Sequence, residues 1–133
     1  MLQATAITAG VCGLILLGTA IDTVRQRFRL MAAHGDMGDA RLISATRSHG
    51  NLAEHAPLVV ILLGLAEGSG RCPWLVWAVA GVFIVARLAH VWGLYHPRPN
   101  GPPPARSVGV VLTWLCLATL SGWVLMLALS QTL

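Results

Sequence analysis

The chain has 133 residues, of which 56% are hydrophobic and only 11% are charged, and its mean hydropathy is +0.71. Soluble domains carry about 25% charged residues, so this composition excludes a soluble protein and predicts one membrane domain over residues 1–133. The formal net charge is +4, but all nine basic residues are arginines beside apolar stretches, without the basic, aromatic-interleaved face of a nucleic-acid-binding protein.

Four stretches are expected to form transmembrane helices, each of which needs about 20 residues to cross a bilayer. Their expected ranges are 3–29, 40–67, 73–95 and 106–130. The purely apolar part of the second, residues 57–66, is too short by itself, so this helix must include the polar stretch from about Leu42. The predicted fold class is therefore all-α, an integral membrane four-helix bundle.

Arginine distribution predicts the topology. A basic cluster follows the first apolar stretch and none precedes it, which favours a retained first helix over a cleaved signal peptide. The first connection, counted with the adjoining helix ends, has Arg25, Arg27, Arg29, Arg41 and Arg47, and the third adds Arg98 and Arg106, whereas the second holds only Arg71. By the positive-inside rule, the first and third connections are cytoplasmic and both termini lie on the other side, in a bacterial inner membrane. Glu67 and Arg71 are expected at the opposite interface.

On the second helix, Arg47, Asn51 and Glu54 are spaced i, i+4, i+7 and therefore share one face. Such a row can bind a zwitterionic ligand, with arginine for a carboxylate, glutamate for an ammonium and asparagine for an amide. The alternative is a structural polar seam between helices. His49 and His55 point away from this face, and nothing nearby completes a metal site with them.

On the third helix, Arg87 and His90 are spaced i, i+3 inside an apolar stretch. A charged side chain at that depth needs a partner, which is expected to be Glu54 or a ligand carboxylate.

The fourth helix begins near Arg106 and Ser107, directly after a proline-rich connection. Ser107 is a candidate N-cap, and Arg106 lies at the cytoplasmic mouth of the bundle, as an anion contact or as a topology anchor. The three cysteines, Cys12, Cys72 and Cys116, are isolated and indicate buried apolar positions rather than a zinc site or a disulfide framework.

The stretch RSHGNLAEHAP at residues 47–57 resembles the second-helix signature of the MAPEG family, the membrane-associated proteins in eicosanoid and glutathione metabolism. Residues 34–38 resemble the preceding loop of its short bacterial members. Residues 87–90 are similar to the third-helix motif, and residues 105–108 are similar to the start of the fourth helix in microsomal prostaglandin E synthase. The likeness covers nearly the whole chain.

The resemblance implies a left-handed four-helix bundle, assembled as a homotrimer within membrane lipid, that binds glutathione between subunits near the cytoplasmic face. Glutathione would be a cosubstrate, and the enzyme a detoxifying transferase, with possible peroxidase activity, that joins the glutathione thiolate to lipophilic electrophiles. Arg106 or Ser107 would stabilise the thiolate. The residues that would contact the tripeptide are Arg25, Arg47, Asn51, Glu54, Arg87 and His90.

The chain departs from the family pattern at two positions. Leu94 stands where well-studied glutathione-using members often have tyrosine, with Tyr95 one residue out of register, and Gly50 replaces a second basic residue of some relatives. A non-enzymatic or different-thiol binding or assembly protein on the same scaffold is therefore an alternative. A small multidrug-type transporter is a weaker one, because that class relies on a carboxylate early in the first helix and residues 1–21 contain no acid.

Overall fold

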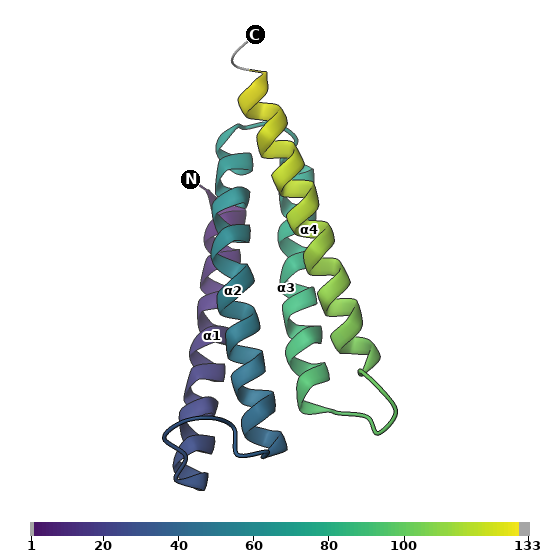
Figure 1. Cartoon of the computed structure of the whole chain (residues 1–133). Helices are drawn as coiled ribbons and strands as arrows, with labels where there is room; N and C mark the ends of the chain where they lie inside the picture. The colour runs from purple at the N-terminus through teal and green to yellow at the C-terminus, as the bar shows by residue number, and fades with distance from the viewer. Residues whose placement is uncertain (1, 131–133) are drawn as a thin grey trace.

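The computed structural model describes residues 2–130 and contains four α-helices (Figure 1). They are α1 (Gln3–Leu30), α2 (Ala40–Gly68), α3 (Pro73–Tyr95) and α4 (Pro104–Leu129). The predicted all-α, four-helix class is confirmed, and the predicted ranges differ from these bounds by at most two residues at either end.

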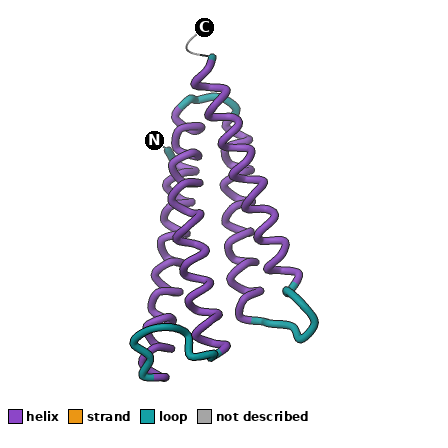
Figure 2. Tube along the Cα trace, in the orientation of Figure 1, coloured by secondary structure: helices purple, strands orange, loops and turns teal. Residues whose placement is uncertain are grey.

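The helices run side by side as an elongated bundle, with α1 beside α2 and α3 beside α4 (Figure 1). Helix α2 contacts each of the other three, whereas α1 and α4 do not pack against each other within the described part of the chain. The α1–α2 and α3–α4 connections lie at one end, and the α2–α3 connection lies at the other (Figure 2). Arg25, Arg27 and Arg29 at the end of α1, Arg41 and Arg47 at the start of α2, Arg98 in the α3–α4 connection and Arg106 at the start of α4 are therefore on the same side of the bundle.

The helix boundaries follow from local chemistry. Asp39 caps α2, where one carboxylate oxygen accepts hydrogen bonds from the backbone N–H groups of Arg41 (3.1 Å) and Leu42 (2.9 Å). Pro73 and Pro104 are the first residues of α3 and α4, where a missing N–H has no cost.

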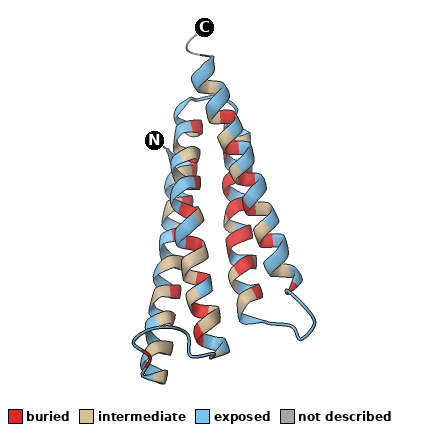
Figure 3. Cartoon of the chain, in the orientation of Figure 1, coloured by how far each residue is buried: buried red, intermediate tan, exposed pale blue. Residues whose placement is uncertain are grey.

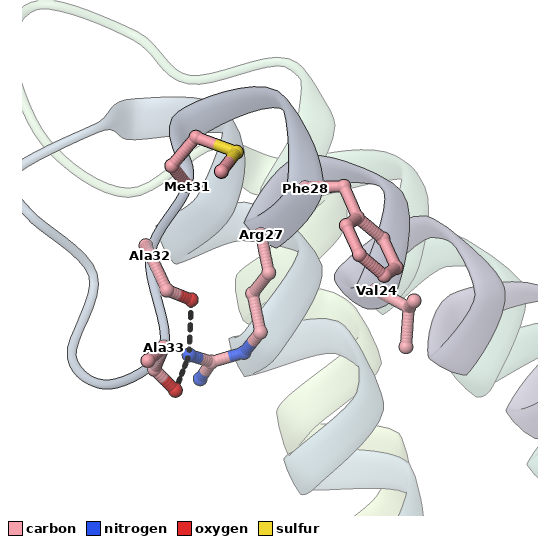
Figure 4. Close-up of a pocket in the computed structure, with 6 residues that line it drawn as sticks. All are labelled: Val24, Arg27, Phe28, Met31, Ala32 and Ala33. Carbon is pink, nitrogen blue, oxygen red and sulfur yellow. Dashed lines mark hydrogen bonds between the residues drawn. The ribbon is translucent and has the colours of Figure 1, made fainter.

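Helix α1 ends at Leu30, and the C-cap residue that follows, Met31, has left-handed backbone geometry. Figure 4 shows the Arg27 guanidinium folded over this end, donating to the carbonyl oxygens of Ala32 (3.5 Å) and Ala33 (3.2 Å). The hollow beside it is lined mainly by apolar side chains, including Phe28. Arg27 therefore acts as a cap for the end of α1.

Glu67 caps the start of α1. Its carboxylate accepts from the backbone N–H of Ala4 (3.0 Å), the backbone N–H of Thr5 (2.8 Å) and the Thr5 hydroxyl (2.7 Å). The sequence suggested only a residue at the membrane interface. The structure adds a second role, because Glu67 satisfies N–H groups that the first turn of a helix leaves without partners.

Three helices, α1, α3 and α4, are long and apolar enough to cross a membrane. Helix α2 does not meet that test by composition, although it is one uninterrupted helix of 29 residues that includes Pro57. The predicted continuity of its polar and apolar halves is thus correct. Buried residues occur along all four helices (Figure 3), and many large apolar side chains are exposed, among them Leu14, Phe28, Trp74 and Trp92.

Candidate functional site

A hollow of about 380 Å³ lies where α2, α3 and α4 meet, toward the end with the α1–α2 and α3–α4 connections. Its lining comes from all three helices and contains five of the eight predicted site residues. Those five are Arg47, Asn51, Glu54, His90 and Arg106. Thr46, Gly50, Leu94 and Val110 complete the lining.

The row on α2 presents unpaired charge to this hollow. Arg47 and Glu54 are exposed and lie two helical turns apart, about 10 Å along the axis. Arg106 of α4 is also exposed. The side chains of these three residues make no hydrogen bond or ion pair with any of residues 2–130. Two cations and one anion are therefore available to a ligand or to a neighbouring molecule.

Arg87 does not pair with Glu54, which was one of the two partners expected from the sequence, the other being a ligand carboxylate. Its side chain is only 2% exposed and donates to Asn51 Oδ1 (2.6 Å), to the Gly109 carbonyl oxygen (3.1 Å) and to the Thr113 hydroxyl. Neutral oxygens of α2 and α4 supply partners for both terminal nitrogens instead, and the buried Nε atom has no hydrogen-bond partner within residues 2–130. Arg87 lies behind Asn51 and does not line the hollow.

His90 is 4% exposed and lines the hollow, and its Nδ1 atom has no hydrogen-bond partner within residues 2–130. Two glycines bring α3 and α4 together here. A Cβ atom on Gly109 would lie 2.8 Å from His90 Cβ, and one on Gly93 would lie 2.7 Å from Arg106 Cβ. Sequence reasoning missed both glycines, since only their coincidence at one helix crossing gives them a role.

Ser107 is not the N-cap of α4, because the helix begins earlier, at Pro104, with Pro103 before it. Ser107 and Arg106 instead line a second hollow of about 700 Å³. This second hollow runs beneath the proline-rich connection to Trp114 and shares Arg106 and Val110 with the first.

The remaining predicted residues lie elsewhere. Arg25 is exposed near the end of α1 and lines neither hollow. His49 Nδ1 lies 3.5 Å from the Thr19 hydroxyl, and His55 Nδ1 lies 2.8 Å from the backbone oxygen of Asn51. Neither histidine lines the first hollow.

Residues 94 and 95 face different surroundings. Leu94 lines the first hollow, and its carbonyl oxygen accepts a hydrogen bond from the Ser44 hydroxyl (2.8 Å). Tyr95 instead donates to Asp22 Oδ2 of α1 at 2.5 Å. The tyrosine of this chain therefore joins α3 to α1 and leaves an apolar side chain in the hollow.

Comparison with known proteins identifies the family. Residues 5–126 match the model of the MAPEG family. The inner membrane protein YecN of Escherichia coli K12 is 35% identical over 113 residues, which cover 85% of this chain and 83% of YecN. YecN of Escherichia coli O6:H1 strain CFT073 matches to the same extent. The chain belongs to the MAPEG family and is an integral membrane protein, which separates it from the small multidrug-type transporters.

Proposed function

We propose that this MAPEG protein is a membrane-bound glutathione transferase that joins the thiolate of glutathione to lipophilic electrophiles. The observation that carries the proposal is the hollow lined by Arg47, Glu54 and Arg106, whose charged groups have no partner within residues 2–130. Charged side chains on the helices of a membrane bundle are costly where they face lipid, unless a ligand or a protein partner binds them.

The chemistry of the hollow suits a zwitterionic tripeptide. Arg47 can bind a carboxylate through two parallel hydrogen bonds, and Glu54 can accept from an ammonium group. Asn51 lies between them and can bind the peptide backbone. Buried His90 adds the Nδ1 atom, which has no hydrogen-bond partner within residues 2–130. These groups lie on two helices, so a ligand of tripeptide length can contact several at once.

The same exposed charges favour assembly. In a single chain, Arg47 and Glu54 line the hollow and are exposed. Hydrocarbon would be an unfavourable neighbour for them, whereas a second copy of the chain would cover them and close the site. We therefore expect a homotrimer with glutathione between subunits, as the family resemblance implies. Arg25, which lines neither hollow of one chain, would contact ligand only from a neighbouring subunit.

Arg106 is placed for thiol activation in this proposal. A cation beside a thiol lowers its pKa and raises the fraction present as thiolate. The thiol proton leaves to solvent, the sulfur electron pair forms a bond to the electrophilic carbon, and the leaving group departs with its bonding electrons. Ser107, next to Arg106, could donate a hydrogen bond to the same sulfur.

The second hollow supplies a place for the electrophile. It is lined by prolines, Val111 and Trp114, and it meets the first hollow at Arg106 and Val110. A lipophilic molecule held there would present its reactive carbon to a sulfur beside Arg106. The arginines gathered at this end of the bundle favour a cytoplasmic location for both hollows in a bacterial inner membrane.

The test uses the full-length protein purified in detergent. Glutathione should raise the thermal midpoint, and an aryl halide should be conjugated only when both substrates are present. Arg47→Gln should weaken both effects. Arg71→Gln, in the connection at the other end of the bundle, is the matched control and should leave them unchanged. A wild-type protein with neither stabilisation nor turnover would refute the proposal.

A second candidate is a MAPEG protein that binds a thiol ligand without catalysis. The observation that favours it is Leu94, an apolar side chain lining the hollow. Stabilisation by glutathione without conjugation of any electrophile tested would support this candidate over the transferase.

A further inference from the structure

We infer that Arg87 is a positioning residue that fixes the side-chain amide of Asn51, so that Asn51 offers the hollow a hydrogen-bond donor. The ligand group that Asn51 recognises is then an acceptor, a carbonyl or carboxylate oxygen. The identity of the ligand as glutathione rests on the proposed function, whereas the orientation of the amide does not.

The orientation follows from the chemistry of the guanidinium. Arginine carries five N–H donors and no acceptor. An Asn51 amide turned the other way would direct its NH₂ group at Arg87 Nη1, donor against donor, across a separation of 2.6 Å. The amide oxygen must therefore face Arg87, and charge on the guanidinium strengthens that bond.

Arg87 itself has little freedom to turn. Its other terminal nitrogen donates to the carbonyl oxygen of Gly109 and to the hydroxyl of Thr113, both on α4. The guanidinium carbon lies 5.6 Å from the centre of the Phe83 ring, within the range of a cation–π contact. Contacts on α3 and α4 thus fix the group that orients Asn51 on α2.

The other half of the amide is free. Asn51 lines the hollow, and its Nδ2 atom makes no hydrogen bond with any residue from 2 to 130. Because Arg87 is 2% exposed and absent from the lining, a ligand meets Asn51 and not the guanidinium. Arg87 therefore affects ligand affinity indirectly, through Asn51. The family resemblance had implied a direct contact between Arg87 and the ligand.

Asn51→Asp tests the donor. Aspartate has nearly the same shape, accepts from Arg87 as well as asparagine does, and cannot donate to a ligand. Glutathione affinity should fall by tenfold or more, while the thermal midpoint without ligand stays at or above that of wild type. Asn51→Leu, which removes the acceptor for Arg87, should lower that midpoint. Unchanged affinity in Asn51→Asp would overturn the proposal.

A double-mutant cycle tests the coupling, since residues that act as a unit give non-additive effects. Arg87→Met and Asn51→Ala should each weaken glutathione binding. The double variant should have the same glutathione affinity as whichever single variant binds glutathione less tightly. Arg47→Gln combined with Arg87→Met is the control and should give additive losses. Additive losses for Arg87 and Asn51 would show that they act separately.

The two proposals fail in different ways. If the wild-type protein binds no glutathione, the transferase proposal fails alone, and the midpoints of Asn51→Asp and Asn51→Leu still decide the amide orientation. Equal destabilisation by these two variants would show that Arg87 does not hold the Asn51 oxygen.

Discussion

Gly93 of α3 lies directly against Arg106 of α4, so that a Cβ atom added at position 93 would lie 2.7 Å from Arg106 Cβ. The added atom would lie closer still to the backbone nitrogen of Arg106 and 2.8 Å from its Cα, and these backbone atoms cannot move aside without moving the start of α4. The position of the arginine proposed to activate the thiol therefore depends on a missing side chain on the adjacent helix.

Gly93→Ala is expected to displace Arg106. Conjugation of an aryl halide should fall by at least about tenfold in kcat/KM, with destabilisation of about 1–3 kcal/mol from overpacking. Gly81→Ala on the same helix is the control, because an added Cβ there has no neighbour within 4 Å. Equal kcat/KM in Gly93→Ala and wild type would show that this helix crossing does not set the position of Arg106.

Glu67→Ala is expected to destabilise the free protein without affecting ligand affinity. It removes the acceptor for the N–H groups of Ala4 and Thr5, and loss of a helix cap costs about 0.5–2 kcal/mol. The measurement is the thermal midpoint in detergent, with and without glutathione. Glu67→Gln keeps one acceptor oxygen and should give an intermediate midpoint. Midpoints identical to that of wild type would refute the cap.

Glu54→Gln is expected to have the opposite pattern. Glu54 is exposed and makes no ion pair within residues 2–130, so neutralising it should leave the midpoint of the free protein unchanged. Losing a charge-assisted contact to the ligand ammonium, about 1.5–3 kcal/mol, should weaken glutathione binding tenfold or more by calorimetry. A loss of about 3–5 kcal/mol in the stability of the free protein would instead indicate an ion pair between Glu54 and Arg87.

Asp39 predicts an acid-dependent step in stability. Hydrogen bonds from the Leu42 backbone N–H and from the Arg29 guanidinium hold the pKa of the Asp39 carboxyl below its usual value. Because the pKa of Asp39 is lower in the folded state, its ionised carboxylate stabilises the fold at pH values above the unfolded pKa, about 3.9. This stabilisation is lost as the pH falls through the pKa of the folded state. Midpoints measured from pH 7 to pH 3 should fall less steeply at the acid end in Asp39→Asn. Parallel curves would contradict this assignment.

Much of the fold could be predicted from sequence because apolar length and proline positions are local properties. The row of Arg47, Asn51 and Glu54 could also be predicted, since helical spacing alone places the three on one face. The partners of Arg87 could not be predicted. They depend on which oxygens of α4 lie beside α3. Glu54 can be identified from the sequence as a possible anionic partner, whereas the position of the Gly109 carbonyl oxygen cannot.

Leu94→Tyr tests whether the departure from the family pattern limits this chain. Leu94 lines the hollow, so a tyrosine there would place a phenol donor and acceptor among Arg47, Asn51 and Arg106. A new hydrogen bond contributes about 0.5–1.5 kcal/mol, so glutathione affinity should rise by roughly two- to tenfold. Tyr95→Phe is the matched control, because the Tyr95 hydroxyl bonds to Asp22 and not to the hollow. Its glutathione affinity should equal that of wild type.

The contradicting outcome for Leu94→Tyr is weaker glutathione binding than in wild type. If the wild-type protein also binds a smaller thiol more tightly than glutathione, the apolar side chain of Leu94 selects a ligand other than glutathione.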